Sequence, residues 1–135
     1  MRKLLTTFVC VWFTLAVWAG DGIYEKLQQI PQISEIQKLD VKPFQEYYQF
    51  WFEQPVDHSD PAKGTFRQRV LLGHKQSDAP VIVELEGYNI WSSEEGELAN
   101  ILKGNQLTIE HRFFDQSVPE GGIPWENPDH QAGCR

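Results

Sequence analysis

The feature that most constrains this fold is an apolar run at residues 80–86 that ends at a glycine, Gly87. A helix-length segment follows, and a second strand-like run covers residues 106–110. This order of strand, helix and strand predicts a β-α-β crossover in a parallel sheet. The first run is apolar on both faces of a strand, as buried parallel strands are, through Val81, Ile82, Val83 and Leu85.

Each predicted strand of the crossover is followed by a polar tripeptide. Glu86-Gly87-Tyr88 stands at the end of the first strand, and Glu110-His111-Arg112 stands at the end of the second. In open α/β sheets, ligands bind beyond the carboxyl ends of the strands. We therefore expect functional residues at these two tripeptides.

The segment between the two strands predicts an amphipathic helix. Ser92 or Ser93 is expected to cap its N-terminus, and Gly104 is expected to end it. Its apolar residues recur at helical spacing, which predicts a buried face made of Leu98, Ile101 and Leu102.

Two earlier segments carry their own patterns. Residues 47–54 and 64–74 are rich in aromatic and β-branched residues and flank a turn-rich segment, which predicts an antiparallel hairpin. Before them, residues 23–39 carry apolar residues at helical spacing on both sides of Pro31. This pattern predicts two short amphipathic helices or turns over an edge of the core.

Residues 1–19 have the pattern of a secretory signal peptide. Arg2 and Lys3 precede an apolar run at residues 4–18, and small residues follow it. The alternative is an uncleaved membrane anchor, for which the run is short, since a span needs about 20 residues. The expected location is therefore secreted or periplasmic.

Cleavage of the leader defines the rest of the organisation. We expect residues 20–43 to form an N-terminal extension and residues 44–135 to form one small domain. Without Arg2 and Lys3 the formal charge is about −9, against −7 for the whole chain, which disfavours nucleic acid and anionic membranes as partners. Cys134 is the one cysteine left, so no internal disulfide is expected, and a lone thiol near the end suggests that a longer chain continued there.

Several motifs in order resemble the N-terminal part of the secreted tripeptidyl and tetrapeptidyl aminopeptidases, which are serine peptidases with an α/β-hydrolase fold. The resemblance covers roughly residues 44–135. Its motifs are FEQPVDH at 52–58, GTFRQRV at 64–70, EGY at 86–88, NQL at 105–107, and EHRFF at 110–114 with Ser117 and Pro119. The resemblance implies an α/β-hydrolase domain that lacks its C-terminal portion.

The nucleophile that this resemblance implies is missing. In an α/β-hydrolase the catalytic serine sits in a Gly-x-Ser-x-Gly elbow after the next strand, and the acid and histidine follow later. None of this chain's serines has glycines at that spacing. We therefore expect the nucleophile, acid and base to lie beyond residue 135, so that this chain contains no catalytic residue and is inactive alone.

The resemblance implies that half of an oxyanion hole remains. This fold takes one oxyanion donor from the loop after its third strand, which corresponds here to Gly87 and Tyr88. Glu86 is a candidate for binding the free amino group of a peptide, or else a carboxylate bonded to loop amides. Glu110, His111 and Arg112 are expected to form a structural cluster of hydrogen bonds and ion pairs. No metal and no organic cofactor is expected.

The predicted function is proteolysis: a hydrolase that releases short peptides from the N-terminus of peptide substrates. The alternative is a self-contained secreted binding module that uses the aromatic strand at residues 47–52 as its contact surface. The resemblance also implies that the strand at 80–86 is paired on one side only in this chain. Such an open apolar edge predicts a marginally folded chain that tends to self-associate.

Overall fold

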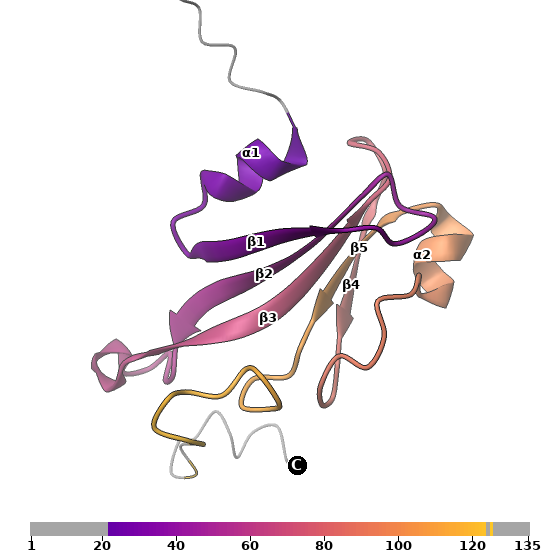
Figure 1. Ribbon diagram of the computed structural model, residues 1–135. Coiled ribbons are helices and arrows are strands. Elements are labelled where there is room, and N and C mark those ends of the chain that lie inside the picture. The colour runs from indigo at the N-terminus through magenta and orange to yellow at the C-terminus, as the bar shows by residue number, and fades with distance from the viewer. Residues whose placement is uncertain (1–21, 124, 126–135) are drawn as a thin grey trace, which may run out of the picture.

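The computed structural model describes residues 22–123 and Trp125. The expected signal peptide at residues 1–19 lies outside these residues. The chain forms one five-stranded sheet with two short α-helices (Figure 1). The elements are α1 Ile23–Gln28, β1 Ile33–Leu39, β2 Glu46–Pro55, the 3-10 turn Pro61–Lys63, β3 Thr65–His74, β4 Val81–Leu85, α2 Glu97–Leu102 and β5 Asn105–Ile109.

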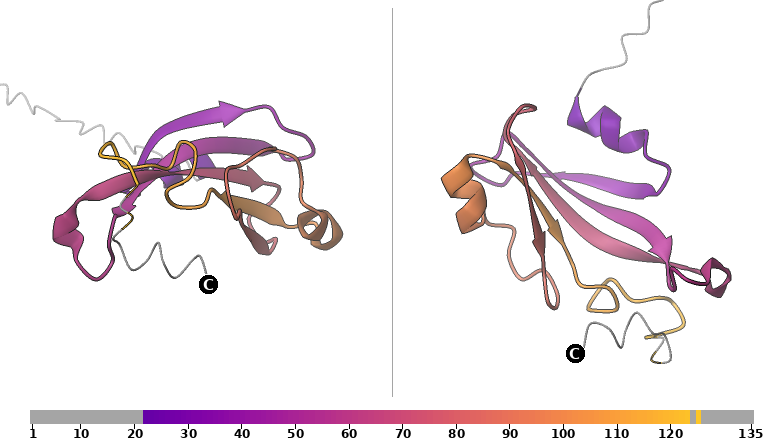
Figure 2. Two further views of the ribbon diagram at one scale, coloured as in Figure 1. Left: turned by 90° about the horizontal axis from the view of Figure 1, so that it is seen from below. Right: turned by 180° about the vertical axis from the view of Figure 1, so that it is seen from behind.

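The sheet is mixed, with the strand order β1-β2-β3-β5-β4. The pairs β1–β2, β2–β3 and β3–β5 are antiparallel, whereas β4 pairs with β5 in parallel. The predicted β2–β3 hairpin and the predicted parallel crossover are therefore confirmed. β1 falls within the expected N-terminal extension at residues 20–43 and is hydrogen-bonded into the same sheet (Figure 2).

The prediction of a second short helix before residue 40 is wrong, because residues 33–39 form β1. A bulge between Ser34 and Gln37, with Glu35 at a φ of 52°, interrupts the alternation of the strand. Ile33 and Ile36 consequently pack on the same cluster although they are three residues apart. These apolar residues, three positions apart, therefore gave the sequence a helical pattern although they lie on a strand.

α2 is shorter than predicted and buries a different side. It begins at Glu97, because the N–H of Gly96 donates to Oε1 of Gln106 (2.8 Å) and holds the preceding segment in a non-helical conformation. The predicted serine cap is therefore wrong. The predicted buried face is wrong as well, since small Ala99 is the buried residue of the helix. The three larger residues are more than half exposed: Leu98, Ile101 and Leu102.

Two apolar clusters lie on opposite faces of the sheet. Tyr48 and Phe50 of β2 pack with Leu27 of α1 on one face, and Tyr47 packs with Phe44 on the other. Burial raises the pKa of the Tyr47 hydroxyl to about 12. Tyr47, Tyr48 and Phe50 are therefore core, so only the other residues of 47–52 stay partly exposed for the alternative contact surface.

The α1 face of the sheet is only partly covered. Under α1 lies a hollow of about 420 Å³ with an almost entirely apolar lining that includes Phe52, Leu107 and Ile109. β4 lies beyond this hollow, at the edge of the sheet. Within the part of the chain that the structure describes, no helix is long and apolar enough to cross a membrane.

Where β4 and β5 begin to pair, the backbone of Gly104 lies close to Pro80 and Ile82. A Cβ at this position would lie 2.8 Å from the carbonyl oxygen of Pro80 and would collide with Ile82. We expect Gly104→Ala to lower the free energy of unfolding by about 1 to 3 kcal/mol through overpacking. Urea unfolding measures this loss. Gly121→Ala is the matched control, since nothing lies within 4 Å of its added methyl, and an equal loss in both variants would contradict the packing argument.

Candidate functional site

The loop after β4 is fixed to the end of β5 at three points. The N–H of Glu86 donates to the carbonyl of Ile109 at 3.0 Å, and the N–H of His111 donates to the carbonyl of Tyr88 at 2.9 Å. Further along, the N–H of Ile90 donates to Oε1 of Glu110 at 3.2 Å. The two tripeptides that the sequence singled out therefore lie side by side at the carboxyl ends of two parallel strands.

Between these anchors the loop presents free hydrogen-bond donors. Within residues 22–123, no acceptor is found for the N–H groups of Gly87, Tyr88 and Asn89. Gly87 is exposed, and no atom lies within 4 Å of the place where its Cβ would be. The loop therefore combines a fixed position with backbone donors that an incoming oxygen atom can reach.

The buried side chain of Glu110 connects the loop after β4 with the elements around it. Its side chain is fully buried, and its Oε2 accepts a hydrogen bond of 2.6 Å from Oγ of Ser117. Arg69 lies 3.6 Å from Oε1 and supplies the opposite charge. Oγ of Ser117 in turn accepts the N–H of Arg69 at 2.9 Å. One carboxylate thus connects β5 with β3, with the β4 loop through Ile90, and with the loop at residue 117.

The other two residues of the predicted cluster hold different elements. Nδ1 of His111 lies 2.7 Å from the carbonyl oxygen of Arg112. Nη2 of Arg112 donates to the carbonyls of Pro55 and Val56, at 3.1 and 2.7 Å, at the end of β2. The expected ion pair of Glu110 is made with Arg69, on a strand that the sequence analysis did not connect with the site.

Aromatic rings lie beside the free donors. Tyr88 is 65% exposed, and its ring meets Phe114 edge to face at a centroid distance of 5.2 Å. His111 makes a similar contact with Phe114 at 5.1 Å. Phe114 therefore supports both rings next to the loop.

The carboxylate of Glu84, on β4, is affected by the charge of Glu86, which follows the end of the strand. Burial raises the pKa of Glu84, and the charge of Glu86 raises it further, against a hydrogen bond from Thr108 that lowers it. No hydrogen bond to the Glu86 carboxylate is found among the described residues, so the alternative of a carboxylate bonded to loop amides is not observed. Glu86 thus keeps acceptor capacity for a cation.

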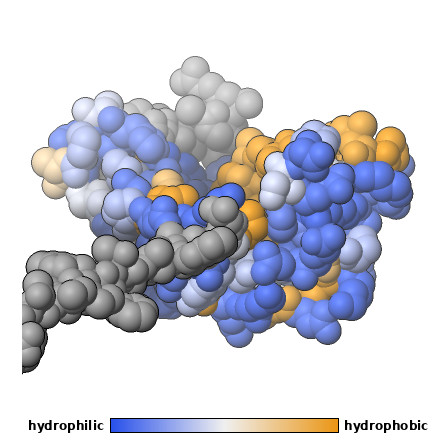
Figure 3. All heavy atoms as spheres, turned by 90° about the horizontal axis from the view of Figure 1, so that it is seen from above, coloured by the Kyte–Doolittle hydropathy of each residue, from blue (hydrophilic) through white to orange (hydrophobic). Residues whose placement is uncertain are grey.

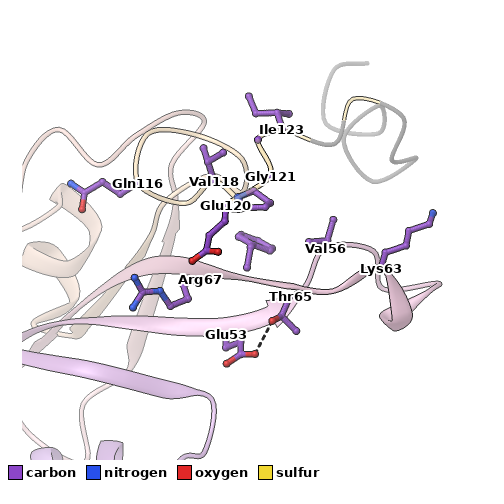
Figure 4. A pocket seen from close by; sticks show the side chains of 13 residues that line it. Glu53, Val56, Lys63, Thr65, Arg67, Gln116, Val118, Glu120, Gly121 and Ile123 are labelled. Carbon is purple, nitrogen blue, oxygen red and sulfur yellow. Dashed lines mark hydrogen bonds between the residues drawn. The ribbon is translucent and has the colours of Figure 1, made fainter.

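A separate groove of about 710 Å³ lies at the far end of the β2–β3 hairpin, against the loop at residues 116–123 (Figure 4). Of its four charged residues, all except Glu120 have partners among the described residues. Lys63 pairs with Asp57, Arg67 pairs with Glu35, and Glu53 accepts a hydrogen bond from Thr65. No group of three metal-ligating side chains is found in the described part of the chain. The groove therefore indicates no chemistry of its own.

The sheet is mixed and contains a parallel crossover, so the chain is an α/β protein. The first strand of the crossover ends in an anchored loop with free N–H donors, which is a candidate anion-stabilising site. The chain belongs to the PS-10 peptidase S37 family, whose sequence model matches residues 18–132. It is 38% identical over 134 aligned positions to the prolyl tri/tetrapeptidyl aminopeptidase of Streptomyces mobaraensis. The alignment covers 89% of this chain but 28% of that relative, so the chain spans less than a third of the relative's length. The predicted resemblance to a peptidase family is confirmed.

The anchoring role of Glu110 is testable by removal of its charge. We expect Glu110→Gln to lower the free energy of unfolding by about 3 to 5 kcal/mol, because it leaves the partly buried Arg69, whose side chain is 18% exposed, without its opposite charge. Chemical denaturation measures the loss. Glu86→Gln is the matched control and should change stability by less than about 0.5 kcal/mol, since that carboxylate accepts no hydrogen bond in the described structure. Equal losses would show that Glu110 anchors nothing.

Proposed function

We propose that this chain is the N-terminal portion of a secreted serine-type aminopeptidase with an α/β-hydrolase fold. In this proposal the whole protein releases short peptides from the N-terminus of peptide substrates, and this chain supplies part of the binding and oxyanion machinery. The observation that carries the proposal is the anchored loop after β4, with the free N–H groups of Gly87 and Tyr88.

These donors have a defined chemical role in acyl transfer. When a nucleophile attacks a peptide carbonyl, its oxygen becomes an oxyanion, and preorganised N–H groups stabilise that charge most strongly in the transition state. Loss of one such donor typically costs about 10² to 10³ in kcat. The hydrogen bond from His111 to Tyr88 and the bond from Ile90 to Glu110 hold the loop in place, so little reorganisation is needed when the charge forms.

Glu86 is the proposed contact for the substrate's free amino group. An aminopeptidase must recognise a positive terminal ammonium, and a carboxylate with open acceptor sites is the side chain that binds one well. Glu84 adds negative charge on the same side of β4. The repulsion between the two carboxylates favours a cation between or beside them. Neither a metal nor an organic cofactor enters this proposal.

The other parts of the proposal concern the whole protein. The apolar leader at residues 1–19 supports secretion or a periplasmic location after cleavage. The acidic balance of the remaining chain supports peptides as partners rather than nucleic acid or anionic membranes. The alignment covers only 28% of the relative, which supports the proposal that the nucleophile, acid and base follow residue 135 in the sequence.

The 135-residue chain should not hydrolyse peptides, because oriented donors cannot replace a nucleophile and a base. The measurement is release of a chromophore from tripeptide- and tetrapeptide-coupled substrates by the purified chain. Turnover that survives serine-directed inactivators and is lost in His111→Ala would contradict the proposal. A contaminating host peptidase is distinguished by its insensitivity to the His111 substitution.

The gene itself separates the proposal from a self-contained binding module. We expect the DNA downstream of codon 135 to encode a Gly-x-Ser-x-Gly elbow in a frame related to this one, as a divided peptidase gene would. Sequencing of the genomic region is the measurement. An unrelated gene directly after a genuine stop codon would favour the module instead.

A further inference from the structure

Three polar side chains form a row on one face of β5 and at its end: Gln106, Thr108 and Glu110. Side chains alternate between the two faces of a strand, so this polar row lies on the face of the sheet where Leu71 of β3 is buried. Gln106 and Thr108 are 3% exposed, and Glu110 is fully buried. A buried polar group is costly unless it is hydrogen-bonded, so the partners of the polar row indicate its role.

The polar row holds the loop after β4 at two places. Near the start of the loop, the N–H of Ile90 donates to Glu110. The loop ends at Gly96, directly before α2, and the N–H of Gly96 donates to Oε1 of Gln106 at 2.8 Å. Nε2 of Gln106 donates to the carbonyl of Glu94 at 3.3 Å. Both ends of the loop are therefore bonded to side chains of β5 or of the residue after it.

Gln106 also connects the loop with the strand that precedes it. Its Nε2 donates to Oε2 of Glu84, on β4, at 2.8 Å and to Oγ1 of Thr108 at 3.1 Å. The carboxylate of Glu84 packs against the backbone of the loop, because a Cβ on Gly96 would overlap its Oε1. One buried amide therefore fixes the end of the loop relative to both β4 and β5.

The apolar side chains of α2 do not fill the space under the end of the loop. Leu98, Ile101 and Leu102 are more than half exposed, and small Ala99 is the buried residue of the helix. Viewed from above, an apolar area covers the margin of the molecule on the α2 side (Figure 3). Polar contacts rather than apolar packing therefore set the position of the far end of the loop.

We propose that Gln106 is a positioning residue for the candidate oxyanion donors at Gly87 and Tyr88. Glu110 holds the loop next to these donors, and Gln106 holds its other end, so the loop is prevented from turning about its first attachment. Donors that are already in place stabilise an oxyanion without reorganisation when the charge forms. The inference deepens the proposed function and rests on it, because a fixed loop matters to catalysis only where its N–H groups meet a developing negative charge.

An exchange of the two hydrogen-bonded side chains tests this role. At neutral pH, Gln106→Glu keeps an oxygen for the N–H of Gly96 but places a carboxylate where the amide donated to Glu84, so the two side chains repel. We expect the N–H of Gly96 to exchange with solvent about tenfold faster, as for the loss of one hydrogen bond, and the amide resonances of Gly87 and Tyr88 to shift. Adding Glu84→Gln returns a donor to the pair, so the double variant should recover most of the wild-type protection and resonance positions.

Residue-resolved hydrogen exchange measured by NMR on the 135-residue chain gives these rates. They are compared with the rates of the β2–β3 strand amides in the same sample, so that a change in overall stability cancels. Asn105→Asp is the matched control, because it makes the same amide-to-acid change one residue earlier, where the side chain bonds Lys75 and Ala79 in the loop before β4. This control should leave the loop after β4 unchanged.

Thr108→Val is a milder variant that gives the readout if Gln106→Glu does not fold. It removes one hydroxyl from the polar row and keeps the shape of the side chain, and it should accelerate exchange at Gly96 in the same direction. Unchanged exchange at Gly96, no recovery in the double variant, or an equal response of the loop to Asn105→Asp would each overturn the proposal. These results are separate from a failure of the proposed peptidase, which an unrelated gene after a genuine stop codon would reveal.

Discussion

The architecture depends on one buried charge, the carboxylate of Glu110. A fully buried carboxylate is stable only when its oxygens are hydrogen-bonded and its charge is balanced. Ser117, Ile90 and Arg69 meet these requirements from three different parts of the chain. Because each partner is needed, the carboxylate at the end of β5 sets the positions of the β4 loop, of β3 and of the loop at residue 117 relative to one another.

The candidate site is a consequence of this anchoring. Strand pairing places Glu86 beside Ile109, and the hydrogen bonds to Tyr88 and Ile90 hold the segment between them. The chain thereby keeps several backbone donors unpaired at an exposed turn without letting the turn move freely. This combination of a fixed backbone and free donors is what stabilisation of an oxyanion requires, and the proposed function rests on it.

The parts of the fold that sequence predicted are those set by local pattern. The hairpin and the parallel crossover follow from runs of apolar and β-branched residues. The errors have non-local causes: a bulge at Glu35 gave β1 a helical spacing, and the side chain of Gln106 delayed the start of α2. The tripeptides of the site were predicted by their position after strands. Arg69 and Ser117 were not assigned to it, because only the folded sheet brings them to Glu110.

Amide hydrogen exchange of the loop after β4 tests the central claim most directly. If the loop is anchored and its donors are free, the N–H groups of Glu86 and Ile90 exchange slowly, whereas those of Gly87, Tyr88 and Asn89 exchange at rates near those of an unstructured peptide. Residue-resolved exchange measured by NMR gives both sets in one experiment. Equally fast exchange across all five amides would show that the loop is not anchored, and slow exchange across all five would show that its donors are not free.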